Sequence, residues 1–433
     1  MPVIVIVGGG FAGIAVARRL EARLRPDEAD IVLLSRENYT LFTPMLPEVT
    51  SGELEVRHVV TPIRTQLHRT RFVLADVDEI DVTERRIRYH HVLTRQNVEQ
   101  AFDHLVLALG SSTSDFGLPG VAEHTWALKS LEDAELLRNH LVWLLEFADT
   151  SADDARRDRL LTIAVVGGGF TGVEAAGEIG QLFRSVLRFY RSLSGRHVKV
   201  ILIEAGPTLL AGLPSKMGQY ARRVLERRGI EVLTGDGVTS ADERGLTLQS
   251  GRRIESETIV WSAGVKPSAL IGKEPALPKT RRGAIETGQD MSVPNFSGIW
   301  ALGDCAAIPD GSGGLYPMTA QHAIREGPHL AENIAASLRG TRTKPFRYKT
   351  LGMMAALGGR AGVAQLLGDR VITGFAAWFL WRTYYLLRLP GLDRKLRVAF
   401  DWTLELLFPR DTSVLRFGEG EGSTSDQEMA LRS

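Results

Sequence analysis

The sequence predicts an α/β fold built from two similar units. The pentapeptide VGGGF occurs twice, at Val7–Phe11 and again at Val166–Phe170. Each copy follows a short run of apolar, mostly β-branched residues, as in a parallel strand buried on both faces. Each copy also precedes a segment of small and apolar residues with helical spacing. We therefore expect two Rossmann-like strand–loop–helix–strand units in one chain.

Composition restricts the class of protein. The chain has 433 residues, which suits two or three domains. Its net charge of +1 gives no reason to expect a nucleic-acid partner. The single cysteine, Cys305, excludes a disulfide framework, a redox-active cysteine pair and a cysteine-rich metal site. The histidines show no metal-ligand spacing, and His90-His91 is expected at the end of a surface strand, so no metal is predicted.

The N-terminal residues do not predict a secretory signal. The first predicted strand begins at Val3, without a charged or cleavable apolar segment before it. No run reaches the roughly 18 uncharged apolar residues that a membrane-spanning helix needs. We therefore expect the chain in the cytoplasm, unless it lies on a membrane surface.

The first glycine loop has the spacing GxGxxG, at Gly8, Gly10 and Gly13. The first glycine allows a tight turn, the second lets the backbone approach a pyrophosphate, and the third lets helix and strand pack closely. The helix N-terminus then presents N–H groups to the phosphates. Ser35 ends the next strand, where an acidic residue usually holds the adenosine ribose. Serine can bond a ribose hydroxyl or simply end a solvated strand, and Arg36 can stack on adenine or reach a phosphate.

The second glycine loop repeats the spacing at Gly167, Gly169 and Gly172, and its next strand ends in Glu204. A carboxylate at this place can accept both ribose hydroxyls of NADH and repels the 2′-phosphate of NADPH. Ala205-Gly206-Pro207 supplies no arginine to compensate, so we predict NADH over NADPH. Either loop alone could be a structural glycine turn, but two complete units argue against that reading.

Three segments resemble the FAD-binding domain of the two-dinucleotide-binding flavoprotein reductases. They are the N-terminal glycine loop, FDHLVLALGSST (Phe102–Thr113) and ALGDCA (Ala301–Ala306). The resemblance implies that Asp304 bonds the ribityl chain of the flavin, although a loop or N-cap role would also explain an aspartate there. It further implies that the second glycine loop binds NADH, in a domain inserted into the FAD domain.

Further matches narrow the resemblance. Disulfide reductases and sulfide:quinone reductases need at least two cysteines, which this chain lacks. SRENYTLFTPMLPEVTSG (Ser35–Gly52) and GGGFTGVEAAGEI (Gly167–Ile179) resemble the type II NADH dehydrogenases, the single-subunit NADH:quinone oxidoreductases. The expected fold is then α/β, with two Rossmann-like dinucleotide-binding domains, the NADH domain inserted in the FAD domain, and a C-terminal membrane-associating segment.

The resemblance also sets the expected boundaries. They are 1–120 and 271–345 for the two parts of the FAD domain, 121–270 for the NADH domain, 346–416 for a C-terminal membrane-association or dimer segment, and 417–433 for a disordered tail. The charged stretch ADTSADDARRDR (Ala148–Arg159) is expected to be a linker or a loose loop.

Catalysis is expected to depend on the alignment of the two cofactors. By resemblance, Glu174 and Gln321 are the catalytic residues: Glu174 holds the nicotinamide carboxamide, and Gln321 lies against the isoalloxazine with Thr43 and Pro44. The other reading of Glu174 is a first-turn helix glutamate placed for the helix dipole. The residues expected to bind FAD and NADH are Gly8, Gly10, Phe11, Ala12, Gly13, Ser35, Arg36, Thr43, Pro44, Val77, Ala108, Gly110, Gly303, Asp304, Gln321, His322, Ala323, Gly167, Gly169, Thr171, Gly172, Glu174, Glu204 and Gly264.

One position departs from the family pattern AQxAxQ, whose glutamines line the quinone site. The segment PMTAQHAIREG keeps Gln321 but has Arg325 where the second glutamine falls. An arginine there could donate to a quinone carbonyl, pair with Glu326, or pair with an acidic substrate. His322 looks like a proton donor but is read as a helix residue that faces elsewhere.

The C-terminal segment predicts two helices. Phe375–Leu389 is rich in aromatic residues but contains Arg382 and Arg388, so it is not expected to span a membrane. An amphipathic helix follows Pro390-Gly391. Its apolar positions are Leu392, Leu396, Ala399, Thr403 and Leu406, and its polar positions are Arg394, Arg397, Asp401 and Glu405. This hairpin suits an anionic membrane surface, while a core or dimer helix pair would show the same pattern.

The expected function is that of a FAD-dependent oxidoreductase. It passes a hydride from NADH to FAD, and then two electrons to a membrane quinone of the menaquinone or ubiquinone class, without proton pumping. It would lie peripherally on the cytoplasmic side of the inner membrane, and the sequence leaves open whether it forms a homodimer. Two alternatives remain open: a soluble reductase or oxidase that passes electrons to oxygen or a small redox protein, and a slow redox sensor of the apoptosis-inducing-factor kind.

Overall fold

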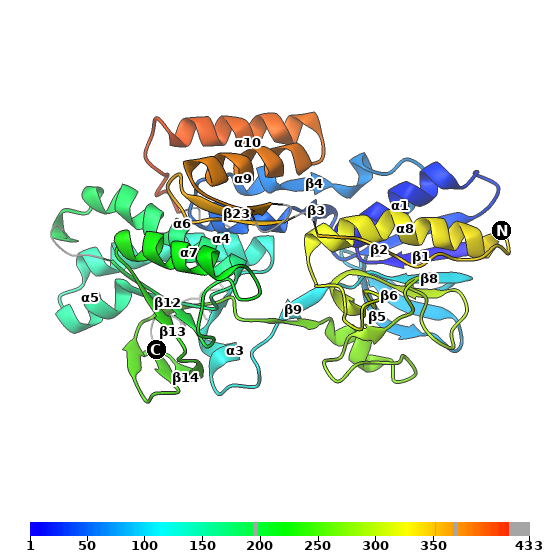
Figure 1. Cartoon of the computed structure of the whole chain (residues 1–433), viewed down its shortest axis with the longest axis horizontal. Coiled ribbons are helices and arrows are strands. Elements are labelled where there is room, and N and C mark those ends of the chain that lie inside the picture. The colour runs from blue at the N-terminus through cyan, green and yellow to red at the C-terminus, as the bar shows by residue number, and fades with distance from the viewer. Residues whose placement is uncertain (194–197, 351, 367–369, 415–433) are drawn as a thin grey trace. The chain divides into compact units, whose positions relative to one another are not determined.

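The computed structural model describes residues 1–193, 198–350, 352–366 and 370–414, so the predicted tail 417–433 lies outside the described residues. The chain divides into two compact units (Figure 1). The first consists of Met1–Leu41, Val60–Ser112 and Val265–Thr350, and the second of Phe42–Val59, Thr113–Gly264 and Leu351–Ser433. The second glycine loop therefore lies in a segment inserted between parts of the first unit.

The first unit is built on a seven-stranded sheet in the order β20-β8-β1-β2-β5-β6-β7. The strands are β1 Val3–Val7, β2 Asp30–Ser35, β5 Arg71–Asp81, β6 Arg86–His91, β7 Asn97–Ala101, β8 His104–Leu107 and β20 Ile299–Ala301. The pairs from β20 to β5 are parallel, and β5-β6-β7 are antiparallel. The central strands β1 and β8 are largely buried, as their apolar runs predict.

Two helices of the first unit, α1 (Phe11–Arg23) and α8 (Ala320–Leu338), lie side by side (Figure 1). Gly327 permits this close packing, because a Cβ there would lie 2.5 Å from the Cβ of Ala15. Short strands complete the unit and lead out of it: β3 Tyr39–Leu41, β4 Val60–Pro62, β9 Ser111–Thr113, β18 Val265–Pro267, β19 Ile285–Glu286 and β21 Ala306–Ala307.

The second unit has a parallel five-stranded sheet in the order β10-β17-β11-β12-β13. Its strands are β10 Trp126–Ala127, β11 Thr162–Val166, β12 Lys199–Glu204, β13 Ile230–Thr234 and β17 Thr258–Trp261. A second, antiparallel sheet has β14 Val238–Asp242, β15 Gly245–Leu248 and β16 Arg253–Glu255. The helices are α2 Leu46–Thr50, α3 Val121–His124, α4 Leu131–Thr150, α5 Asp154–Leu160, α6 Phe170–Val186 and α7 Ser215–Arg227. Both units are α/β, as predicted.

The segment 148–159 corrects the sequence reading. The expected linker is helical over most of its length, because α4 continues to Thr150 and α5 begins at Asp154. Asp153 stabilises the start of α5, where its side chain accepts hydrogen bonds from the N–H groups of Ala155 and Arg156. The high charge of this stretch marks a solvated helix face and not a loose loop.

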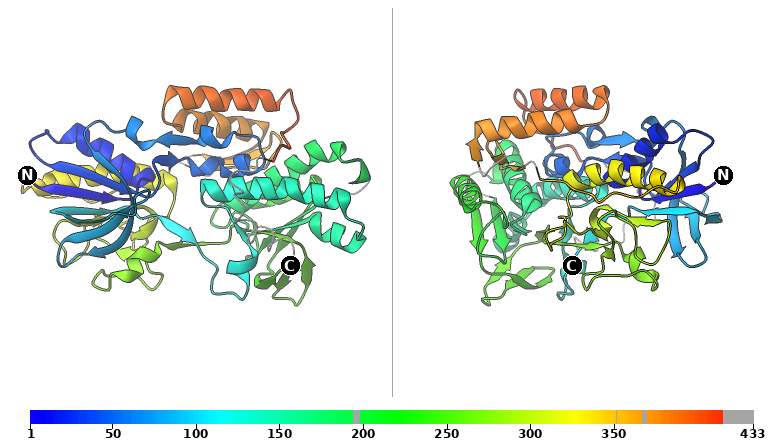
Figure 2. Two further views of the ribbon diagram at one scale, coloured as in Figure 1. Left: turned by 180° about the vertical axis from the view of Figure 1, so that it is seen from behind. Right: turned by 45° about the vertical axis from the view of Figure 1, so that its right-hand side comes forward.

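The C-terminal part of the second unit consists of an antiparallel sheet and a helical hairpin. The strands are β22 Met353–Ala356, β23 Gly362–Leu366 and β24 Arg370–Gly374, and the helices are α9 Phe375–Arg388 and α10 Leu392–Glu405. Figure 2 shows the two helices side by side. The prediction of two helices is confirmed. No helix in the described part of the chain is long and apolar enough to cross a membrane.

Candidate functional site: two glycine loops and their surroundings

The two glycine loops have nearly the same backbone. Gly8 has a φ of +114° and Gly167 one of +113°, in the region that favours glycine. A Cβ at Gly13 would lie 1.9 Å from the carbonyl oxygen of Gly8. A Cβ at Gly172 would lie 1.8 Å from that of Gly167. Both loops therefore have the tight turn and the close packing that the GxGxxG spacing predicts.

The middle glycines of the two loops, Gly10 and Gly169, face open space. No heavy atom of the described residues outside the loop itself lies within 4 Å of a Cβ built at either position. Each is the N-cap of a helix, α1 or α6, and no described side chain caps either helix. The first N–H groups of both helices can therefore bind a phosphate, which the helix dipole also favours.

The residue at the end of the strand that follows each loop and its helix differs between the two units: it is Ser35 in the first and Glu204 in the second. Ser35 is buried, and a Cβ at Gly9 would lie 2.6 Å from its Oγ. Glu204 occupies the matching place beside Gly168. Its carboxylate accepts hydrogen bonds from the N–H groups of Gly168 and Gly206, both at 2.6 Å. One loop thus has a neutral hydroxyl beside it and the other a fixed negative charge.

Further predicted residues gather beside the first loop. Gly303 has a φ of +71°, and a Cβ there would lie 3.3 Å from the Cβ of Ala12. The carboxylate of Asp304 accepts a hydrogen bond from Ser111 Oγ at 2.7 Å. Gly110 has a φ of +66° and open space around a built Cβ. These residues follow the carboxyl ends of β8 and β20, which is where open α/β sheets bind their ligands.

The start of α8 carries the position that departs from the family pattern. Glu326 accepts a hydrogen bond from Gly303 N–H at 2.8 Å, and burial raises the pKa of Glu326 to about 7. The guanidinium carbon of Arg325 lies 4.5 Å from the ring centroid of Tyr348, and Arg325 donates to the carbonyl of Gln321. Among the described residues the suggested Arg325–Glu326 pair is therefore not formed. Tyr348 donates its hydroxyl to Gln321 Oε1 at 3.0 Å.

His322 is buried at the first turn of α8. Its Nδ1 lies 2.7 Å from Thr319 Oγ1, and its ring packs against those of Tyr316 and Tyr348. Burial lowers the pKa of His322, and the charge of Arg325 lowers it further. A neutral, enclosed imidazole fits the reading of a helix residue better than that of a proton donor.

The other predicted residues of the first unit have fewer contacts with the first glycine loop. Ala108 lies against the first loop, since its carbonyl oxygen would be 2.2 Å from a Cβ at Gly8. Phe11 begins α1, and Ala323 lies in the first turn of α8. The Arg36 side chain is exposed, with its Nε 3.7 Å from Glu37.

Val77 lies on β5, where the pairing with β6 is irregular, and the structure adds no contact that favours its assignment. Thr43, Pro44 and Thr171 belong to the second unit. Thr43 and Pro44 form a short 3-10 helix with Met45. Thr171 lies in the first turn of α6.

The remaining predicted residue, Gly264, has a φ of +82°. A Cβ there would lie 2.4 Å from the ring of Phe116. Glycine is therefore the residue type that this close approach requires.

Glu174 lies on the buried face of α6, beyond its first turn. The alternative reading as a first-turn glutamate is therefore wrong. Its Oε1 accepts hydrogen bonds from Ala356 N–H at 2.9 Å and from Trp381 Nε1–H at 3.1 Å. Burial raises the pKa of Glu174 to about 8, so the side chain is largely protonated at neutral pH. A neutral carboxylic acid can both donate to and accept from an amide.

Sequence reasoning missed a buried charge cluster in the second unit. Arg410 donates to Glu53 and to Glu178, both at 2.8 Å, and Arg382 also donates to Glu53. Burial raises the pKa of Glu53 and of Glu48. The sequence contains one sign of this cluster. Glu178 stands four residues after Glu174 on the apolar side of a predicted helix, where a buried glutamate without a partner is costly.

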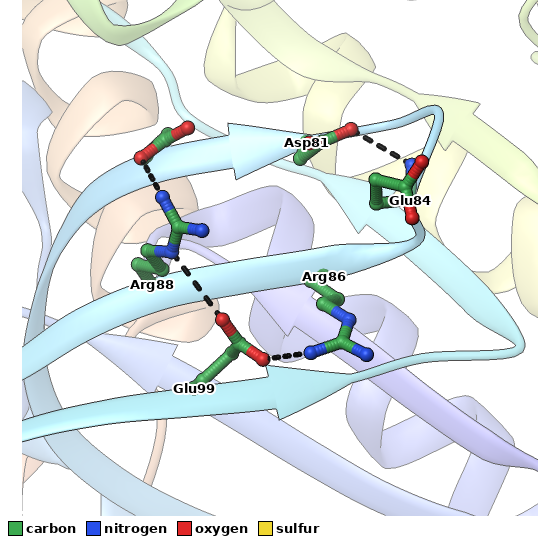
Figure 3. Close-up of a pocket in the computed structure, with 6 residues that line it drawn as sticks. Asp81, Glu84, Arg86, Arg88 and Glu99 are labelled. Carbon is green, nitrogen blue, oxygen red and sulfur yellow. Dashed lines mark hydrogen bonds and ion pairs between the residues drawn. The ribbon is translucent and has the colours of Figure 1, made fainter.

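Two pockets differ in character. The first, of about 190 Å³, lies on β5, β6 and β7, and its lining residues are all charged (Figure 3). Arg88 pairs there with Glu79 and Glu99, and Arg86 pairs with Glu99. These exposed pairs satisfy one another and resemble a solvated sheet surface. The second pocket, of about 430 Å³, lies beside the buried charge cluster of the second unit.

Comparisons with known proteins agree with this geometry. Residues 2–327 match the pyridine nucleotide-disulphide oxidoreductase family, and residues 350–411 match the NDH2 C-terminal domain. The type II NADH:quinone oxidoreductase Ndh of Mycobacterium tuberculosis is 32% identical, over 99% of this chain and 91% of that protein. A type II NADH:quinone oxidoreductase of Staphylococcus aureus is 30% identical, over 87% of this chain and 92% of that protein.

Solved structures show the same fold. NDH2 from Plasmodium falciparum, solved in complex with NADH, matches with a TM-score of 0.86 at 20% identity, over 95% of this chain and 99% of that chain. The sulfide:quinone oxidoreductase of Aquifex aeolicus matches with a TM-score of 0.70 at 18% identity, over 97% of this chain and 100% of that chain.

The two glycine loops and the first match define a flavin-type, pyridine-nucleotide-dependent oxidoreductase. The C-terminal match and the identity over nearly the whole chain narrow this class. The chain belongs to the type II NADH:quinone oxidoreductase family.

Burial of Glu174 predicts a pH-dependent stability effect. Between its ordinary pKa of 4.5 and its raised pKa of about 8, the folded chain holds a proton that the unfolded chain has lost. The folded state therefore loses stability as pH rises through this window. Glu174→Gln removes the effect, so its Tm relative to wild type should rise by about 5 °C from pH 5 to pH 8. Glu243→Gln is the control, and a pH-independent Tm difference for Glu174→Gln would contradict the assignment.

Proposed function

We propose that the first unit binds FAD, the second binds NADH, and the enzyme passes electrons from NADH through the flavin to a quinone. The observation that carries the proposal is the pair of glycine loops with matching backbones and unlike surroundings. With the bounds of the two units, the proposed FAD part is 1–41, 60–112 and 265–350, where the sequence predicts 1–120 and 271–345, and the proposed NADH part is 113–264, where it predicts 121–270. Residues 42–59 group with the second unit.

The residues of the first unit fit FAD. The open space at Gly10 and the N-terminus of α1 accept a pyrophosphate, and Ser35 offers a hydroxyl to the ribose. Asp304 would hold the ribityl chain, and Gln321, fixed by Tyr348, would face the ring system. Bound FAD would supply a two-electron acceptor for the hydride of NADH.

In the second unit, the N-terminus of α6 and Gly169 would bind the pyrophosphate of NADH, while Glu204 would accept the ribose hydroxyls. Glu174 would hold the nicotinamide carboxamide. It is oriented for this role by Trp381 and Ala356, which fix one of its two oxygens. The protein thus contributes alignment, and no protein acid or base is needed for the hydride step.

The acceptor must be diffusible, because the chain cannot use a dithiol. Cys305 is its only cysteine, and burial raises the pKa of this thiol to about 12, so it is unreactive. Reduction of a quinone by NADH consumes one proton and yields NAD⁺ and a quinol. We propose that this reaction proceeds without proton pumping, which the membership of the type II family supports.

We propose that the hairpin of α9 and α10 binds a membrane surface. Six large apolar side chains on it are each between 59% and 72% exposed: Phe375, Phe379, Leu387, Leu392, Leu396 and Phe400. The inner face of α10 packs on the rest of the second unit through Val398 and Trp402. On this face Asp401 contacts His58 at 2.5 Å and Arg394 donates to the carbonyl of Arg57. An amphipathic helix oriented in this way presents its apolar side outward. We place it on the cytoplasmic side, where NADH is made.

Spectroscopy tests the function directly. We expect a yellow protein whose flavin absorbance is bleached by NADH. A short-chain quinone should restore this absorbance rapidly, and oxygen from air should restore it much more slowly. Fast reoxidation by air alone would select an oxidase instead. Bleaching without turnover on any acceptor would select a redox sensor.

Glu204 should determine the choice of nicotinamide cofactor. The wild type should favour NADH over NADPH by about 100-fold in kcat/KM, because the carboxylate repels the 2′-phosphate. Glu204→Gln should reduce this ratio by about tenfold, mainly by improving the use of NADPH. Steady-state kinetics with a short-chain quinone measures both values, and Glu231→Gln, on the neighbouring strand β13, is the control. Equal kcat/KM values in the wild type would refute the assignment.

Membrane binding should depend on the exposed apolar face. Deletion of the segment would be a poor test, because Trp381 and Arg410 bond buried groups elsewhere in the second unit. The triple variant Phe379→Ser, Leu396→Ser and Phe400→Ser should bind vesicles at least about 100-fold more weakly, since each side chain contributes about 2 kcal/mol when buried.

Vesicle flotation measures this binding, and Leu93→Ser, which changes an 84% exposed leucine of the first unit, is the control. Flotation equal to wild type would contradict membrane binding by this face. Loss of a dimer in sedimentation, without loss of flotation, would assign the face to a homodimer contact.

A further inference from the structure

The second pocket has no role in the proposed electron transfer. It lies within the second unit and has a volume of about 430 Å³. Four arginines and three glutamates line it, together with Gln181, Gly359 and Trp378. The charged residues are Arg184, Arg228, Arg360, Arg382, Glu53, Glu178 and Glu405.

Positive charge exceeds negative charge in this pocket. Glu53 and Glu178 are already paired at its base with Arg410, which lies 3.6 Å from Glu405 as well. Arg382 pairs with Glu53 from the wall of the pocket. Three arginines therefore remain without an acidic partner in the pocket: Arg184, Arg228 and Arg360.

The first two of these arginines are held in fixed positions. Arg228 donates to the carbonyls of Leu357 and Gly359, at 2.7 and 2.8 Å. Arg184 donates to the carbonyl of Arg228 at 2.9 Å and to Gln181 Oε1 at 3.0 Å. Burial lowers the pKa of Arg184, and the neighbouring charge of Arg228 lowers it further. The fold thus holds like charges close together, an arrangement that an anion would stabilise.

The third arginine is available to a ligand. Arg360 is exposed, and no hydrogen bond or ion pair within the described chain engages it. Its φ is +62°, a conformation in which glycine would be less strained. A further donor in the wall is also unused, because Arg382 is nine-tenths buried and its Nε has no hydrogen-bond partner among the described residues.

We propose that this pocket binds the phosphate group of an anionic ligand through Arg184, Arg228 and Arg360. Guanidinium groups bind phosphate oxygens in pairs of parallel hydrogen bonds, so three of them can satisfy one phosphate. The phosphate can come from a soluble metabolite or from the headgroup of an anionic lipid. The lipid source agrees with the pocket wall, because α9 contributes Trp378 and Arg382 to it and exposes Phe375 and Phe379 to the surroundings.

The experiment compares two probes on the full-length flavoprotein. Calorimetry measures the binding of glycerol 3-phosphate, and flotation measures binding to phosphatidylglycerol and phosphatidylcholine vesicles. The test variant combines Arg184→Gln with Arg360→Gly. Glycine tolerates the backbone of residue 360, so the second change introduces no strain. The control is Arg223→Gln, an exposed arginine of α7 outside the pocket.

The test variant should bind at least one probe more than tenfold more weakly, while Arg223→Gln stays within twofold of wild type. Loss with glycerol 3-phosphate assigns a soluble phosphate ligand. Loss confined to phosphatidylglycerol vesicles assigns a lipid headgroup, and this arm rests on the membrane binding proposed above. No loss in either probe, or equal loss in test and control variants, overturns the proposal.

NADH oxidation with a short-chain quinone separates this proposal from the proposed function. The test variant should retain the wild-type rate with this soluble acceptor, because neither residue is part of the cofactor sites. If the wild type is inactive with the quinone but binds phosphate through these arginines, the proposed function is refuted and the proposed phosphate site is still supported.

Discussion

The contact between the third glycine and the first carbonyl of each loop is the constraint on which the structure depends. Gly13 and Gly172 lie so close to the carbonyls of Gly8 and Gly167 that only hydrogen fits. This contact places the start of a helix directly over the carboxyl end of a buried strand. In each unit, the first N–H groups of the helix then point to the open space beside that unit's own loop. This arrangement suits the binding of a pyrophosphate. Ser35 lies beside the first of these two loops and Glu204 beside the second.

Side chains far apart in the sequence make the two sites unlike. In the first unit, the hydroxyl of Ser35 and the carboxylate of Asp304 surround the loop, with a buried network at the start of α8. In the second unit, Glu204 is fixed by the backbone of its own loop, and Glu174 is fixed by the C-terminal segment. Trp381 joins the hairpin of α9 and α10 to the proposed nicotinamide site through its hydrogen bond to Glu174, so the C-terminal segment supports that proposed site directly.

The sequence predicts the elements whose causes are local. Glycine loops, buried strands and amphipathic helices depend on residues within about ten positions of one another, and the predictions for them are confirmed. The contacts of Arg410 with Glu53 and Glu178 join three distant segments, so no local pattern shows them. The helix at 154–160 was missed for another reason: high charge was interpreted as a linker or loose loop, although the sequence offers an N-cap aspartate at Asp153. The cofactor residues themselves remain proposals.

Binding of unlike dinucleotides by matching loops is tested most directly with two single variants. A Cβ at Gly10 or at Gly169 meets open space, and both backbones are extended, so valine at either place should leave the fold intact. We predict that Gly10→Val purifies without flavin absorbance. Gly169→Val should keep its flavin, which dithionite reduces, but NADH should no longer bleach it. Loss of flavin from Gly169→Val, or full flavin content in Gly10→Val, would contradict the account.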